Sequence, residues 1–397
     1  MEYKLGDVVK IKYGKNQKNV KNPNGKYPIL GTGGIMDYAD DYLYDKPSVL
    51  IGRKGSIDKV RYIEEPFWTI DTLFYTEIDT DIVNPKYLFY KLSTIDFQFY
   101  NEGTTIPSLR TETLNKIKIS LPSLKKQNKV AKILNYLDQK IEVNENVIAN
   151  LEELSQTLFK RWFVDFEFPD EKGNSYKSNG GLIKESSIGK LPKYWKVISL
   201  SELSLSIHAG GTPSRKKEDY WDNGNIPWLK TKEIKNNIIV SAEEFISDIG
   251  LKNSSAKWIK GDSVVMAMYG ATAGSIGYLA SPMTSNQACC AFETDFPIFT
   301  YLYLYNNQDY IKSLASGSAQ QNLNKKTLED LQLGIPDLES LWNFEVLVNP
   351  IFNQAIQLVK ENNDLTNLRD TLLPKLMSGE IELPDELEVD EHAELLQ

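Results

Sequence analysis

The sequence predicts an α+β fold in which two similar mixed α/β domains are each followed by a long helix. Two observations carry this prediction: the chain repeats itself after 214 residues, and each copy closes with apolar residues at coiled-coil spacing. Size agrees with it. With 397 residues, 41% of them hydrophobic, the chain has the length of two to four compact units and the apolar material for their cores.

The internal repeat is seen when the sequence is shifted against itself. Toward the start of each copy the offset drifts, as expected if loops differ in length, so that Gly55-Ser56-Ile57 corresponds to Gly274-Ser275-Ile276. The shift by 214 aligns Tyr87 with Tyr301, Leu88 with Leu302, Gly103 with Gly317, Leu109 with Leu323, Pro122 with Pro336, and Leu151, Leu154 and Leu158 with Leu365, Leu368 and Leu372.

Short apolar runs within each copy suit buried strands. The segments 48–52 and 262–267 are apolar, and turns rich in glycine and asparagine punctuate the sequence around them. Each copy is therefore predicted to begin with a mixed α/β domain.

The second part of each copy is predicted to be a long helix, because apolar residues alternate four and three apart. Asn144 and Ser155 interrupt the first stripe, where polar residues usually cost stability while fixing register and pairing. Asn362 and Arg369 are the polar exceptions in the second stripe. A helix of roughly 35 to 40 residues is about 55 to 60 Å long. The apolar positions are Leu134, Leu137, Ile141, Ile148, Leu151, Leu158 and Trp162, and then Phe344, Val348, Ile351, Ala355, Leu358, Leu365, Leu372 and Leu376.

Pro350 interrupts the second stripe, which predicts either a kink or a helix start with Asn349 as N-cap. The predicted segments are a first mixed α/β domain at 1–122, a first long helix at 123–168, an exposed polar linker at 169–187, a second mixed α/β domain at 188–336, a second long helix at 337–379 and an acidic tail at 380–397.

The net charge of −9 hides an uneven distribution. From Glu380 onward the chain carries eight acids and no Lys or Arg, and the rest has a net charge of −1. The segment from Lys10 to Pro28 carries six lysines and no acid. Such a bipolar molecule has a basic region that can neutralise phosphates.

Two segments of the first domain are candidates for nucleic-acid binding. One is lysine-dense and ends at an aromatic residue, and the other places an Arg-Lys pair between two glycines, where Arg53 could grip guanine O6 and N7. Charge alone does not separate the first segment from a solvated loop. The candidate residues are Lys15, Lys18, Lys21, Lys26, Tyr27, Arg53, Lys54, Ser56, Lys59 and Arg61.

The second domain carries different residues at corresponding places, which suggests that the two domains recognise different sequences. Its candidates are Arg215, Lys216, Lys217, Lys230, Lys232, Tyr269 and Thr272. The polar runs 103–108 and 317–322 could contribute, although turn formation explains them almost equally well.

No catalytic or metal-binding residue and no cofactor of this chain are predicted. Histidine occurs only at His208 and His392, and no phosphate-binding loop or methyltransferase motif is found. The adjacent Cys289 and Cys290 fit a reducing cytoplasm. No secretion signal or span of about 18 apolar residues occurs, so a membrane partner is not expected.

Motifs in the second copy resemble the specificity subunits of type I restriction-modification systems. The segment 189–197 (Gly-Lys-Leu-Pro-Lys-Tyr-Trp-Lys-Val), with 210–214 and 224–228 after it, resembles the opening of a target recognition domain in that family. The segments 119–122 and 373–381 resemble the family's closing motifs, and the likeness covers nearly the whole chain except about the last dozen residues.

This resemblance implies a pseudo-twofold arrangement of two target recognition domains separated by two long antiparallel coiled-coil helices. It implies double-stranded DNA with a bipartite target as ligand, two modification (methyltransferase) subunits that use S-adenosylmethionine to methylate adenine, and restriction subunits that use ATP and Mg. The chain itself would be non-catalytic and would determine which DNA sequence the complex recognises.

Two alternatives stay open at the level of sequence. A coiled-coil adaptor without DNA specificity would share the helices, but the lysine-dense loops argue against it. A restriction-methylation enzyme that uses this fold as its DNA-reading part would need catalytic motifs that the chain lacks.

Overall fold

The computed structural model describes residues 1–170, 172–315 and 322–384. They form two compact units, each considered by itself below. The first unit combines Met1–Glu142 with 364–384, and the second is Val143–Asn363. None of the helices in these ranges is long and apolar enough to cross a membrane.

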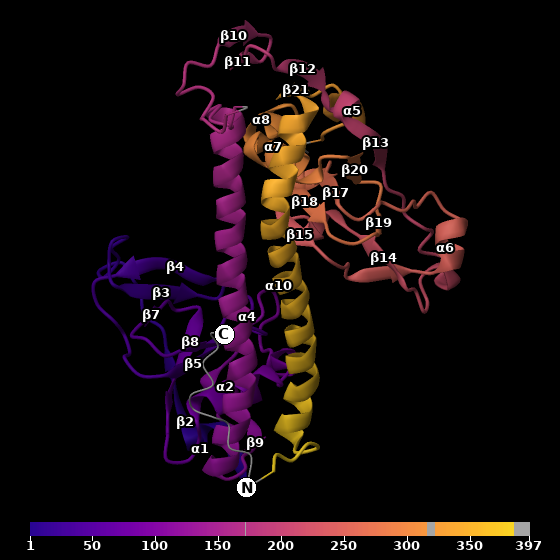
Figure 1. The fold of residues 1–397 in the computed structure, drawn as a ribbon. Coiled ribbons are helices and arrows are strands. Elements are labelled where there is room, and N and C mark those ends of the chain that lie inside the picture. The colour runs from indigo at the N-terminus through magenta and orange to yellow at the C-terminus, as the bar shows by residue number, and fades with distance from the viewer. Residues whose placement is uncertain (171, 316–321, 385–397) are drawn as a thin grey trace. The chain divides into compact units, whose positions relative to one another are not determined.

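The first unit contains three groups of paired strands, ordered β2-β8-β5-β6, β4-β3-β7 and β1-β9 (Figure 1). Helix α2 begins at Pro85, whose fixed φ suits a first helical position, and the Asn84 side chain caps it by accepting a hydrogen bond from the Tyr87 amide. The elements are β1 (Glu2–Lys4), α1 (Leu5–Val8), β2 (Val9–Tyr13), β3 (Tyr27–Gly31), β4 (Gly34–Ala39), β5 (Ser48–Gly52), β6 (Val60–Ile63), β7 (Trp68–Thr69), β8 (Leu73–Ile78), α2 (Pro85–Ser93), η1 (Phe97–Tyr100), α3 (Thr111–Leu114) and β9 (Lys118–Ser120).

The second unit has the strand orders β13-β20-β17-β18-β15, β16-β14-β19, β12-β21 and β10-β11. Its elements are β10 (Ile183–Ser186), β11 (Gly189–Pro192), β12 (Lys196–Ser199), α5 (Leu200–Leu203), β13 (Ser204–Ala209), η3 (Glu218–Tyr220), β14 (Ile226–Leu229), η4 (Thr231–Glu233), β15 (Asn237–Ile239), β16 (Glu244–Ile246), α6 (Asp248–Lys252), β17 (Ser263–Ala267), η5 (Gly270–Thr272), β18 (Ile276–Leu279), β19 (Thr284–Ser285), β20 (Cys289–Thr294), α7 (Pro297–Asn306), α8 (Gln308–Ser313), α9 (Lys325–Glu329) and β21 (Gln332–Ile335).

The strand orders of the two units repeat. The order β2-β8-β5-β6 corresponds to β13-β20-β17-β18, to which the second unit adds β15. In both three-stranded sheets the central strand, β3 or β14, pairs antiparallel with one neighbour and parallel with the other. The ladder β1-β9 corresponds to β12-β21. The predicted pair of similar mixed α/β domains is therefore confirmed.

Both predicted long helices are present, as α4 (Leu124–Phe159) and α10 (Leu338–Ser378). A π-helical turn, η2 (Lys160–Val164), follows α4. The expectation that Pro350 starts a helix is wrong, because α10 begins at Leu338 and continues through it. Pro350 and Val346, whose carbonyl loses its usual amide donor, are both exposed, so water can satisfy that carbonyl.

In each unit the parts of α4 and α10 pack together and run antiparallel. In the second unit Asn144 Nδ2 donates to Asn362 Oδ1 at 2.9 Å, and the rings of Phe159 and Phe344 lie 6.1 Å apart. In the first unit Arg369 Nη1 donates to Asp138 Oδ1 at 2.9 Å. Polar residues in the stripes thus pair across the seam.

Ser155 differs from the other polar residues of the stripes, because its hydroxyl donates to the Leu151 carbonyl of its own helix at 2.9 Å. A bond within one helix cannot select a partner helix. The predicted role of this residue in register and pairing therefore has no cross-helix contact behind it.

A buried glutamine of α4 holds helix α2 of the first domain. Gln127 is 1% exposed, its Oε1 accepts from the Asn84 backbone N at 2.9 Å, and its Nε2 donates to the Ile82 and Pro122 carbonyls. Tyr90 adds a second contact, since its hydroxyl donates to Asp138 at 2.5 Å. Burial and this carboxylate raise the pKa of Tyr90, which keeps it a donor.

A buried glutamate of α10 does the same for helix α7 of the second domain. Glu345 accepts from the backbone N of Phe299 at 2.7 Å and of Ile298 at 3.4 Å, at the first turn of α7. Burial raises the pKa of Glu345 to about 7, and the two backbone hydrogen bonds oppose that rise.

The predicted linker 169–187 is mostly exposed but contains regular structure. Tyr176 stacks on Phe168 with ring centroids 4.7 Å apart, and β10 forms a hairpin with β11. In the predicted acidic tail, residues 385–397 lie outside the described part of the chain. The bounds of the six predicted segments stay predictions.

Candidate nucleic-acid interface

The loop that joins β5 to β6 contains the Arg-Lys pair, and two glycines shape it. A Cβ on Gly52 would lie 2.2 Å from the Ser56 carbonyl oxygen, and Gly55 has φ +83°. The first position requires close backbone approach and the second a left-handed conformation, so both favour glycine. The resulting turn places Arg53 and Lys54 between strands of the main sheet.

Arg53 is held in a defined orientation. Its Nη1 donates to the Asp71 carbonyl at 2.6 Å, and its guanidinium carbon lies 5.2 Å from the centroid of the Tyr13 ring. The side chain remains 24% exposed. Its backbone N also donates to Thr72 O at 2.8 Å. Because Asp71 and Tyr13 orient the guanidinium and leave it partly exposed, its remaining N–H groups can donate to an external acceptor.

Lys54 is exposed beside a second loop. It forms an isolated bridge with Ser108, and the Gly55 amide donates to the Pro107 carbonyl at 2.9 Å. The Arg-Lys turn and the polar run 103–108 are therefore neighbours, which their sequence separation did not indicate. Ser56 is half-buried under this turn, and Lys59 is exposed before β6.

The start of the lysine-dense segment lies beside the turn that holds Arg53. The Lys15 amide donates to Thr69 O at 2.8 Å, and the Trp68 indole donates to Lys15 O at 2.9 Å. Since Arg53 binds Asp71 and Thr72, the structure brings Lys15 and Arg53 to the same turn, 69–72. This turn therefore links two of the predicted basic residues that are distant in the sequence.

The other lysines of the segment lie apart from that turn, along the sheet β4-β3-β7. Lys21 forms an ion pair with Asp37 at 2.5 Å, which lowers the pKa of Asp37. Lys26 lies 5.4 Å from the Tyr27 ring centroid, and Lys18 is exposed. Arg61 does not join the Arg-Lys turn: its Nη2 reaches the Thr32 carbonyl, at 3.5 Å, by the turn between β3 and β4.

In the second domain Arg215 packs on two indole rings. Its guanidinium carbon lies 3.5 Å from the Trp221 ring centroid and 5.0 Å from that of Trp228, and its Nη2 donates to Glu244 Oε2 at 2.5 Å. Stacking and the ion pair orient a side chain that stays about half exposed.

Two acids compensate two of the four other predicted cations here. Glu244 pairs with Lys230, and Glu243 with Lys232; these lysines, with Arg215 as a second partner of Glu244, hold the pKa of both carboxyls below the usual range. Phosphates would therefore compete with internal ion pairs at these positions.

The remaining cations of this group are both exposed. Lys217 donates to the Tyr220 hydroxyl at 2.8 Å, whereas Lys216 forms no ion pair among the described residues. Lys216 is therefore the predicted cation of this loop with the least internal competition for a phosphate.

Tyr269 and Thr272 lie between β17 and β18, as the Arg-Lys turn lies between β5 and β6. Tyr269 bridges Asn322 as Lys54 bridges Ser108, and Gly274 has φ +81° where Gly55 has φ +83°. Both turns are bridged to a neighbouring loop and contain glycine at positive φ, but the second turn differs by the short helix η5 (Gly270–Thr272), and a 41% exposed tyrosine takes the place of a lysine.

Sequence reasoning missed the residues that hold the cations. Tyr13, Asp71, Glu243 and Glu244 were not singled out, although Tyr13 directly precedes the lysine-dense loop and could have drawn attention. In the described ranges no group of three or more His, Cys, Asp or Glu side chains could hold a metal ion.

Comparison with known proteins gives one consistent family. The model of the type I restriction modification DNA specificity domain matches residues 1–153 and 192–341. The specificity subunit of the type I restriction enzyme MjaIX of Methanocaldococcus jannaschii is 27% identical over 353 residues, which are 86% of this chain and 79% of that protein. The HindI specificity subunit of Haemophilus influenzae is 26% identical over 377 residues, 79% of this chain and 81% of that protein.

A solved structure shares the fold. The crystal structure of the S subunit of a type I restriction-modification system from M. genitalium has a TM-score of 0.64, with 19% sequence identity over 95% of both chains. Both the family match and this likeness extend over the two repeated domains.

Proposed function

Because this chain belongs to the type I restriction modification DNA specificity family, we propose that it recognises a bipartite DNA target, one half with each domain. It is a specificity subunit, the non-catalytic member of such a system. The single observation that carries the bipartite proposal is a pair of unlike turns at equivalent places: between equivalent strands and bridged to equivalent loops, the first domain presents Arg53 and Lys54 and the second presents Tyr269. Unlike side chains at equivalent places suit two unlike half-sites.

Within the first domain, Arg53 and Lys54 take different roles. Arg53 is oriented by Asp71 and Tyr13 and would grip a base edge, for which a planar two-pronged donor is suited. Lys54 and Lys15 are exposed and would contact phosphates. In the second domain, Arg215 on its indole platform and Lys216 would take the corresponding roles.

The partners follow from the same proposal. Two modification subunits would methylate adenine with S-adenosylmethionine, and restriction subunits would use ATP and Mg. The chain itself would hold no cofactor and would act in the cytoplasm. Flipping of the target adenine would then occur in the modification subunits.

The test is to assemble the chain with its modification subunit and to map methylated adenines in a DNA library. Methylation should occur only at a bipartite sequence, and the chain alone should transfer no methyl group. Arg53→Gln should relax base choice at one position of one half-site, by about 1–3 kcal/mol of discrimination. Lys54→Gln should weaken binding to all sequences and lower the salt slope by about one.

Arg215→Gln is the matched variant in the second domain and should relax the other half-site. Urea unfolding of each variant separates a reading defect from a folding defect. Loss of discrimination in both halves from Arg53→Gln alone would contradict the assignment of one half-site to each domain.

A further inference from the structure

The beginning of helix α4 carries a stripe of lysines that is not part of the repeat. Lys125, Lys129, Lys132 and Lys140 are spaced by four, three and eight residues and so lie on one helical face. At the positions 214 residues further on, α10 has Glu339, Asn343, Val346 and Gln354. The basic stripe is therefore a feature of α4 that α10 does not share.

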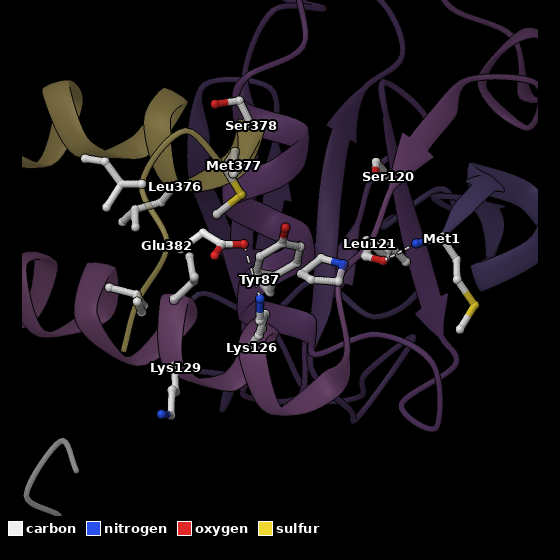
Figure 2. A pocket seen from close by; sticks show the side chains of 15 residues that line it. Met1, Tyr87, Ser120, Leu121, Lys126, Lys129, Leu376, Met377, Ser378 and Glu382 are labelled. Carbon is white, nitrogen blue, oxygen red and sulfur yellow. Dashed lines mark hydrogen bonds and ion pairs between the residues drawn. The ribbon is translucent and has the colours of Figure 1, made fainter. Parts of the chain in front are cut away.

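The segment that follows α10 leads the chain to this stripe. Gly379, with φ +82°, ends α10, and the partly buried Ile381 and Leu383 pack against the core of the first unit. We call residues 380–384 the strap. It borders a cavity of about 180 Å³, lined also by Met1 and Tyr87, at the start of α4 (Figure 2).

Two lysines of α4 already bind the strap. Lys126 Nζ lies 3.4 Å from Glu382 Oε1 (Figure 2). Lys129 Nζ donates to the Pro384 carbonyl at 3.0 Å. Lys129 belongs to the basic stripe, so the last described residue of the chain sits at its edge. What comes next in the sequence has the opposite charge: 385–397 holds six acids and no Lys or Arg.

We propose that the acidic segment 385–397 docks on the basic stripe of α4 and shields it from other polyanions. The acidic segment and the basic stripe have opposite charges, and neither is part of the repeat. They adjoin at Pro384, whose carbonyl accepts a hydrogen bond from Lys129 of the stripe. Reach is sufficient. Thirteen residues span up to about 43 Å when extended, and Lys129 to Lys140 covers about 17 Å of helix.

The shield has a physical use in a DNA-binding chain. A row of lysines on a helix binds any polyanion through counterion release, independent of sequence. Covering the row with an attached anion removes that binding without removing the lysines, and the cover is strongest at low salt.

The first experiment is a cycle of two charge variants of the full chain. One neutralises the tail (Asp385→Asn, Glu386→Gln, Glu388→Gln, Asp390→Asn, Glu391→Gln and Glu394→Gln), and the other the stripe (Lys125→Gln, Lys132→Gln and Lys140→Gln), leaving the strap contacts of Lys126 and Lys129. The probe is a poly(dG)·poly(dC) duplex, which holds no adenine and so cannot be a methylation target. Binding is measured by anisotropy at several salt concentrations.

Neutralising the tail should tighten binding at least about tenfold at low salt and steepen the salt slope by about 3. The same change in the stripe variant should have little effect. An equal gain with and without the stripe lysines would mean that the tail acts only through net charge and would overturn the proposal. Weaker duplex binding by the stripe variant with its natural tail would overturn it too, since the stripe would then be open to DNA.

Disulfide trapping gives an independent readout of docking. The two natural cysteines are fully buried, so the pair Lys132→Cys and Glu388→Cys should form an intramolecular disulfide under mild oxidation. The control pair Asp81→Cys and Glu388→Cys uses an exposed site in the same unit, off the stripe. Equal trapping of both pairs would refute docking, while sequence-specific methylation of DNA would be unaffected by that result.

Discussion

Glu345→Gln should remove a loss of stability that the second unit undergoes as the pH rises. The carboxyl is 7% exposed, and its pKa is raised from 4.5 to about 7 in the folded protein. Between these values the unfolded chain has released a proton that the folded chain retains, so the stability of the wild type falls as pH rises. A difference of about two and a half pKa units corresponds to about 3 kcal/mol.

Glutamine keeps an amide oxygen for the two backbone N–H donors of α7 but does not titrate. The stability of the wild type relative to Glu345→Gln should therefore fall by about 2 to 3 kcal/mol from pH 5 to pH 8. Urea unfolding followed by tryptophan fluorescence is a suitable assay, because six of the seven tryptophans lie in the second unit. Glu339→Gln, at an exposed position of the same helix, is the control.

A stability difference that stays constant between pH 5 and pH 8 would refute this reasoning, since the carboxyl would then have the same pKa in both states. A difference that changes with the opposite sign would mean that the two N–H donors at the start of α7 outweigh burial.

Three further predictions concern other sites. Asp138→Asn removes the anionic partner of Arg369 and should cost about 1–3 kcal/mol, seen as faster hydrogen exchange in α2 and in the adjoining part of α10; unchanged exchange would contradict a role in seating the domain. Gly55→Ala should loosen the Arg-Lys turn by about 1–2 kcal/mol and Gly55→Asn by less, because the left-handed φ is the obstacle and open space surrounds the Cβ position; hydrogen exchange of 48–63 measures it, and equal effects would point to a steric cause. Cys289 and Cys290 are buried, which raises the pKa of both thiols to about 12, so a thiol reagent at pH 8 should label them only after unfolding; rapid labelling of the native chain would show that β20 opens.

The repeat and the helices could be predicted because their signals are periodic and local. Both long helices and the two similar domains are present, and two polar residues of the stripes, Asn144 and Arg369, bond to residues of the facing helix. Of the two alternatives at Pro350, the helix start is wrong, because the sequence does not show that Val346, whose carbonyl loses its amide donor, lies at an exposed position where water can replace that donor.

The candidate interface was only partly accessible to sequence. Basic residues can be found by composition, but their environment depends on pairings distant in the chain. Arg53 depends on Asp71 and Tyr13, and Lys230 on Glu244; no local pattern indicates either. The neighbourhood of Lys54 and Ser108, which lie 54 residues apart, likewise arises from tertiary contacts.

The two helix-capping contacts have a consequence for how such chains can diversify. Gln127 and Glu345 seat their domains by gripping main-chain N–H groups, which every residue except proline supplies. A foreign domain grafted onto these helices would need the same backbone path at these contacts and side chains that pack on the helices as Tyr90 does, whereas its exposed DNA-facing loops could differ. These contacts do not involve the loops that face DNA, so domains with a different DNA specificity could be carried by the same pair of helices.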